Sequence, residues 1–169
     1  MPHYDLPKAA PGPLRLVQRF VNTIDREHGR EWLGTPAELA AFFGCAEGAL
    51  SVDEALGLRD ALCRLLAENN GRKAEPEVRA TFNRFAARVT AQLDRGGAPE
   101  LVGDDPLGEV VAVAFRAMLD GSWARLKTCR NCTWAFYDYS RNRSGGWCSM
   151  QLCGNRAKTR AYRGRKAVR

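Results

Sequence analysis

Four of the six cysteines lie within 25 residues near the end of the chain, and their spacing suits a metal ion. Two residues separate Cys129 from Cys132, and four separate Cys148 from Cys153. A tight turn between two such cysteines aims both sulfur atoms at one point, and four thiolates in a tetrahedron are preferred ligands of structural zinc. We therefore predict one structural Zn²⁺ ion held by Cys129, Cys132, Cys148 and Cys153.

The same four cysteines could instead form two disulfides, remain buried thiols or hold an iron–sulfur cluster. The N-terminal residues lack the apolar core of a signal peptide, and no apolar run is long enough to span a membrane, so we expect a cytoplasmic protein without a membrane partner. Thiols stay reduced in the cytoplasm, which favours a metal over disulfides.

The other two cysteines, Cys45 and Cys63, lie in helical, apolar segments, and we expect them in the hydrophobic core.

The segment that carries these cysteines is too short to bury a sufficient core of its own. Between Cys132 and Cys148 the chain can run outward through β-prone aromatic residues, turn over residues 142–146 and return. In comparable small modules metal binding supplies folding free energy on the order of 10 kcal/mol. We predict a small treble-clef-like zinc finger with four cysteine ligands, followed by a basic C-terminal helix.

The charge of the chain is divided unevenly. Residues 125–169 hold 12 Lys or Arg and one acidic residue, whereas residues 1–124 hold 14 Lys or Arg and 18 Asp or Glu. An acidic body with a basic end indicates a polyanionic partner, and the excess of arginine favours forked contacts to phosphates and guanine edges. The candidate nucleic-acid contacts are Arg141, Arg143, Asn155, Arg156, Lys158, Arg160, Arg163, Arg165 and Lys166.

A folded zinc module with a basic helix commonly presents that helix to a groove of DNA, so DNA is the predicted partner. RNA, an acidic protein surface and a solvated tail without a partner remain alternatives. One short helix discriminates little between sequences, and a homodimer that reads two half-sites would add discrimination.

The elements before the finger are mostly helical, which predicts a mainly α (α+β) fold. Apolar periodicity and capping residues predict helices over residues 14–25, 35–44, 51–72, 76–89 and 105–121. Between the last two, a Gly-Gly turn predicts one small β-hairpin. The predicted organisation is a flexible arm (1–13), a helical domain (14–122) and a zinc finger with a basic tail (123–169).

The helical domain carries no catalytic fingerprint, so we expect no enzyme activity, although a site assembled from scattered residues stays an alternative. There is no G-x-S-x-G, no phosphate-binding glycine loop and no H-E-x-x-H. Around "FVNTID", a small-molecule effector pocket could be lined by Asn22, Thr23, Arg26 and Trp32. Alternatively, Asn22 and Thr23 bond the backbone where a helix meets a loop.

Two strings near the end, "FYDYSRN" and "WCSMQLCGNRAK", resemble the CGNR zinc-finger family, which is named for the tetrapeptide at residues 153–156. Earlier strings, "FVNTID", "TPAELAAFF", "LRDALCRLLAENN" and "DPLG", resemble in order the ABATE domain that precedes this finger. The resemblance spans roughly residues 14–166. It implies a bacterial stress-induced transcription regulator in which the four cysteines hold zinc and Asn155, Arg156 and Lys158 face nucleic acid. Relatives often carry two basic residues where this chain has Gly145-Gly146, which argues against a phosphate grip at that turn.

Overall fold

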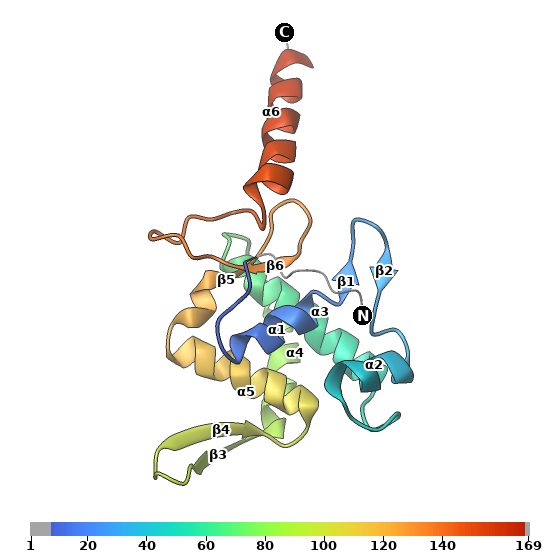
Figure 1. Ribbon diagram of the computed structural model, residues 1–169, viewed down its shortest axis with the longest axis vertical. Helices are drawn as coiled ribbons and strands as arrows, with labels where there is room; N and C mark the ends of the chain where they lie inside the picture. The colour runs from blue at the N-terminus through green and yellow to red at the C-terminus, as the bar shows by residue number, and fades with distance from the viewer. Residues whose placement is uncertain (1–7, 168–169) are drawn as a thin grey trace.

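The computed structural model describes the backbone of residues 8–167 and the side chains up to Arg163 (Figure 1). The helices are α1 (Leu14–Val21), α2 (Pro36–Phe43), α3 (Val52–Glu68), α4 (Pro76–Phe85), α5 (Pro106–Leu119) and α6 (Asn155–Ala167). The strands form three antiparallel pairs: β1 (Ile24–Asp25) with β2 (Arg30–Glu31), β3 (Val89–Leu93) with β4 (Pro99–Gly103), and β5 (Leu126–Thr128) with β6 (Ala135–Tyr137). The predicted mainly helical class is confirmed, with two small hairpins beyond the one expected.

Three of the predicted helix starts are confirmed by their caps. Thr35 and Glu38 form a reciprocal capping box at α2, the Ser51 hydroxyl accepts from the backbone N–H of Glu54 at α3, and Asp105 accepts from that of Gly108 at α5. Glu54 does not complete a box, because its carboxylate lies against Arg88 instead.

Two predicted helices end earlier than their apolar pattern suggested. The first stops at Val21, because the β-branched pair Thr23 and Ile24 turns into the short strand β1. The helix predicted to reach Val89 ends at Phe85, and Val89 opens the β3–β4 hairpin. This hairpin packs closely on α5: a Cβ atom at Gly103 would lie 1.9 Å from the backbone nitrogen of Glu109, so only glycine fits there.

The main core lies between α1, α3, α4 and α5, and it continues into the zinc finger. Ala135 and Tyr137 of β6 join this core, whereas Phe136 between them packs with Cys129 and Cys153 in a second, smaller cluster. Alternate side chains of a strand face opposite sides, so β6 belongs to both clusters at once. The finger is therefore supported by the helical domain as well as by its own cysteines.

Residues 8–13 of the predicted arm lie against the rest of the protein, and residues 1–7 are outside the described part of the chain. The Lys8 carbonyl accepts from the Tyr137 N–H at 2.9 Å, and the Ala9 carbonyl accepts from the Tyr139 hydroxyl at 2.6 Å. Ala10 is fully buried, and its N–H donates to the Gln18 side chain. This stretch closes one side of the β6 strand.

Helix α6 stands away from the body, at the opposite end of the molecule from the β3–β4 hairpin (Figure 1). None of the helices in the described residues has both the length and the apolar character needed to cross a bilayer.

Candidate metal centre and nucleic-acid interface

The four finger cysteines converge on one point. Their Sγ atoms all lie within 4.8 Å of one another, and the Cys132–Cys148 and Cys148–Cys153 sulfur distances are both 3.6 Å. A tetrahedron of Zn–S bonds about 2.3 Å long has edges of about 3.8 Å, whereas a disulfide brings its sulfurs to about 2.05 Å. The cysteines are free, and this spacing and donor set fit zinc.

Local structure aims the sulfurs. In the knuckle after β5, the Cys129 N–H donates to the Trp134 carbonyl at 2.8 Å, and Thr133 takes a left-handed conformation (φ 65°) that closes the turn. Cys153 lies in a π-turn (Met150–Gly154) that begins at Ser149, whose hydroxyl accepts from the backbone N–H of Leu152. The knuckle thus carries the first pair of cysteines, and the π-turn carries Cys153, five residues after Cys148.

The electrostatics of the cluster also favour a cation. Hydrogen bonds from Cys132, then from Cys148, hold the pKa of Cys129 far below its usual range. The hydrogen bond to Cys129 in turn raises the pKa of Cys132 well above its usual range. Four crowded sulfurs cannot all carry negative charge unless a positive ion lies between them.

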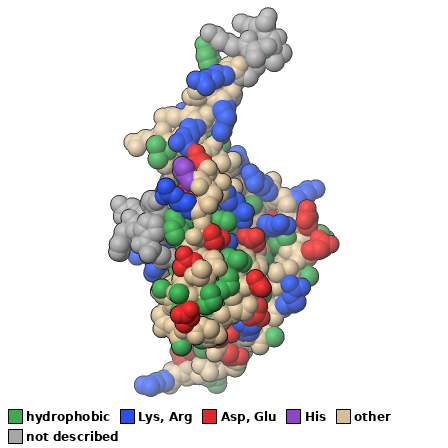
Figure 2. Space-filling view, turned by 90° about the vertical axis from the view of Figure 1, so that its right-hand side faces the viewer, with side chains coloured by type: hydrophobic (Ala, Val, Ile, Leu, Met, Phe, Trp, Pro, Cys, Tyr) green, Lys and Arg blue, Asp and Glu red, His purple; other side chains and the backbone are tan. Residues whose placement is uncertain are grey.

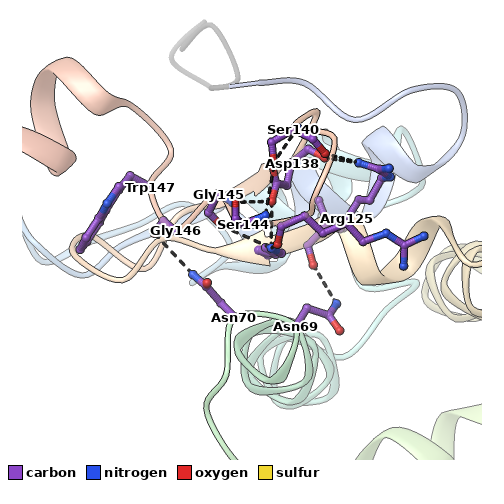
Figure 3. Close-up of polar contacts among 12 residues, drawn as sticks. Asn69, Asn70, Arg125, Asp138, Ser140, Ser144, Gly145, Gly146 and Trp147 are labelled. Atoms are coloured by element: carbon purple, nitrogen blue, oxygen red, sulfur yellow. Dashed lines mark hydrogen bonds and ion pairs between the residues drawn. The ribbon is translucent and has the colours of Figure 1, made fainter.

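A buried ion pair shapes the loop that joins the two cysteine pairs. The Lys127 Nζ lies 2.9 Å from the Asp138 Oδ2, and the two side chains are 4% and 1% exposed. The Asp138 carboxylate also accepts from the N–H groups of Ser140 (3.0 Å) and Gly145 (2.8 Å), as Figure 3 shows. Burial raises the pKa of Asp138, but the hydrogen bonds from Lys127, Ser140 and Gly145 outweigh it and hold that pKa well below its ordinary value.

Gly145 is required by this arrangement. A Cβ atom at this position would lie 2.7 Å from the Asp138 Oδ1. The Gly146 carbonyl accepts from the Arg130 N–H at 3.1 Å and faces Asn70 (Figure 3). The Gly-Gly turn is thus a structural part of the finger.

Three asparagines of the helical domain hold the finger through its backbone. Asn22 accepts from the Ala135 N–H at 2.6 Å and donates to the Ala135 carbonyl at 3.0 Å. Asn69 donates to the carbonyls of Trp123 and Leu126, both at 2.8 Å, and Asn70 donates to that of Thr128 at 2.9 Å. From the sequence, Asn70 gave only a helix-end signal together with Gly71, because the partners of Asn69 and Asn70 lie more than 50 residues away.

The four candidate effector residues do not gather around one pocket. The Thr23 hydroxyl donates to the Phe20 carbonyl at 2.7 Å, as the alternative of a local backbone bond predicted. Asn22 also bonds backbone, but that of the distant Ala135 rather than that of its own turn. Trp32 is half-buried just after β2. Arg26 forms an exposed ion pair with Asp60 at 2.9 Å and lines two hollows between the domain and the finger, which the other three residues do not line.

The predicted basic contacts on α6 fall into two groups. Arg156 forms an ion pair with Glu27 at 2.6 Å and so points back toward the helical domain, whereas Arg160 donates to the Asn131 side chain in the finger knuckle. Lys158 and Arg163 are exposed, with no hydrogen-bond or ion-pair partner among the described residues. Figure 2 shows Lys and Arg side chains along this helix and the upper body, while most acidic side chains on that face lie lower.

The remaining predicted contacts extend this surface. Asn155 is exposed at the start of α6, and Arg141 and Arg143 are exposed on the finger loop. The side chains of Arg165 and Lys166 lie outside the described residues. Within α6, Ala157 is half-buried and Ala161 is exposed. The helix backbone continues through Gly164 to Ala167.

Comparison with protein families agrees with this architecture. Residues 125–166 match the model of the CGNR zinc finger, and residues 14–122 match the ABATE model, described as "Putative stress-induced transcription regulator". No curated protein matches the sequence. The ABATE match covers more than half of the chain, and the chain therefore belongs to the ABATE family and carries a CGNR zinc finger behind its ABATE domain.

Proposed function

We propose that this protein is a transcription regulator that binds DNA through its zinc finger and helix α6. The observation that carries the proposal is the placement of α6: it begins two residues after the last finger cysteine and projects from the body with exposed basic side chains. Thirteen helical residues span about 20 Å, and the major groove of DNA admits an α-helix.

One face of α6 has the chemistry needed to contact base edges. Asn155, Thr159 and Arg163 follow one another at intervals of four residues and line a shallow groove along the helix. Arginine pairs with guanine, asparagine with adenine, and threonine with either base type. Lys158 lies on another face of the helix, where it would reach a phosphate.

In this proposal a single zinc ion has a structural role, and the protein is not an enzyme. Four thiolate ligands leave no open position for a substrate or water. When bound, zinc would hold the knuckle and the π-turn together, so that α6 leaves the finger in a fixed direction. A homodimer on two half-sites would supply the discrimination that one helix lacks, and a DNA partner implies a cytoplasmic location.

The test is fluorescence anisotropy of the zinc-loaded chain with a labelled pool of duplex DNA. Contact with about five phosphates predicts a log–log salt slope near −4 to −5. The double variant Lys158→Ala/Arg163→Ala should bind at least tenfold more weakly, and its matched control is Arg95→Ala at the tip of the distant β3–β4 hairpin. Affinity that is insensitive to salt, or equal in both variants, would refute the proposal. Stronger competition by duplex RNA than by DNA would assign the surface to RNA.

A further inference from the structure

A pocket of about 290 Å³ lies along the seam between the ABATE domain and the finger. We call it the seam pocket. Its floor is apolar and comes from Val21, Ile24, Cys63 and Ala67. Burial, then the neighbouring Asp60 carboxylate, raises the pKa of Cys63 to about 11, so this thiol is neutral at physiological pH. The floor therefore suits a small apolar group, and the volume lies at the low end of ligand pockets.

The rim of the seam pocket is electropositive. The lining residues include three arginines, Arg26, Arg64 and Arg72, but one acidic residue, Asp60, which pairs with Arg26 at 2.9 Å. Arg64 approaches only the exposed Glu75, at 3.7 Å, and the Arg72 side chain has no hydrogen-bond or ion-pair partner within the part of the chain described. Arg72 is thus available to bind an oxyanion, and Arg64 would give up only a long, exposed ion pair to join it. Arginine binds oxyanions through forked hydrogen bonds.

The remaining wall belongs to the zinc finger. Thr128 and Thr133 line the pocket, and each is adjacent in sequence to a finger cysteine, Cys129 or Cys132. The Thr133 hydroxyl donates to the Cys132 carbonyl at 2.6 Å. A molecule in the seam pocket would therefore touch both domains, and its binding would be thermodynamically linked to how the finger sits on the body.

We infer that the seam pocket binds a small organic oxyanion with an apolar body. The carboxylate or phosphate group would lie between Arg64 and Arg72, and the apolar body would lie on Cys63 and Ala67. An apolar floor is not needed for contact with a nucleic-acid backbone, and no residue of α6 lines the pocket. The site is therefore distinct from the proposed DNA-binding surface.

The test uses the zinc-loaded full chain without nucleic acid, so its result is independent of the proposed function. Benzoate and phenyl phosphate are the probes, and benzyl alcohol is the uncharged control. Binding is followed by ¹H–¹⁵N NMR titration, and we expect saturable shifts at the amides of Thr128 and Thr133 with at least one anion. Benzoate binding alone would assign a carboxylate ligand, and phenyl phosphate binding alone would assign a phosphate ligand. Binding of neither anion would overturn the inference.

Three variants locate the site. Arg72→Gln removes an exposed charge and should weaken binding at least tenfold. Ala67→Met fills the floor and should abolish binding while every arginine remains; if it fails to fold, Arg72→Gln alone decides. Arg95→Gln, at the far hairpin, should bind as the wild type does. Equal binding by Arg72→Gln and Arg95→Gln would show that the anion binds elsewhere and would reject the seam pocket.

Discussion

The Arg156 Nη1 lies 2.6 Å from the Glu27 Oε1, so the ABATE domain neutralises the arginine of the finger's CGNR tetrapeptide. Both side chains are about half exposed, which makes the pair accessible to competing anions. A phosphate of a nucleic acid and the Glu27 carboxylate would therefore compete for the same guanidinium group.

Replacing Glu27 by glutamine should raise DNA affinity. The change frees Arg156, and because exposed ion pairs contribute about 0.2–1 kcal/mol, the expected gain is roughly 1.5- to 5-fold, and it is largest at low salt. Fluorescence anisotropy with labelled duplex DNA measures this gain in affinity. The matched control is Glu47→Gln, which removes an exposed carboxylate of the body that lies outside the finger's contacts. An equal gain in both variants would show that only net charge matters.

Zinc removal should unfold part of the finger and leave the helical domain folded. The β5–β6 hairpin shares the main core through Leu126, Ala135 and Tyr137, whereas the knuckle and the π-turn depend on the four sulfurs. After chelation, we expect hydrogen exchange to become fast at residues 129–134 and 147–154 and to stay slow in α3 and α5. Cys148→Ser should reproduce this pattern and Cys45→Ser should not. Loss of protection from hydrogen exchange throughout the chain would contradict the prediction that only part of the finger unfolds.

The features that sequence analysis found are those set by neighbouring residues. The cysteine spacing predicted one cluster, and Thr35, Ser51 and Asp105 marked the starts of three helices, because a cap needs only the next three residues. The β3–β4 hairpin was equally local, since a Gly-Gly turn joins its strands.

The features that could not be predicted from the sequence depend on contacts between distant segments. Asn22 bonds a residue 113 positions away, and Glu27 pairs with one 129 positions away. No periodicity or short motif encodes such pairs, and the same asparagine could equally have bonded its own turn. The core shared by the domain and the finger was missed for the same reason, because β6 alternates between two clusters that only the folded chain defines.

Gly145→Ala should destabilise the protein by about 2 kcal/mol or more. The added Cβ would lie 2.7 Å from the buried Asp138 carboxylate, which cannot move without breaking its pair with Lys127. Urea unfolding measures the effect. Gly57→Ala is the control, because open space surrounds that position in α3 and alanine there should stabilise by up to about 1 kcal/mol. Unchanged stability in Gly145→Ala would mean that the turn can shift without cost.

The Lys127–Asp138 pair should make stability fall in acid. The pKa of Asp138 is lowered in the folded protein from its ordinary value of 3.8, so the pair's contribution to stability is complete above about pH 5 and is lost as the pH falls toward the folded pKa. Asp138→Asn does not titrate and leaves Lys127 buried without its partner, which should cost about 3–5 kcal/mol at pH 7. Urea unfolding from pH 7 to pH 3 measures the difference in the free energy of unfolding between the variant and the wild type. We expect this difference to stay constant down to about pH 5 and to shrink below about pH 4.

The control is Asp53→Asn, at an exposed carboxylate of α3. Its free energy of unfolding should differ from that of the wild type by less than about 0.5 kcal/mol at pH 7. A difference for Asp138→Asn that did not change with pH would show that the buried carboxylate does not stabilise the finger through its charge.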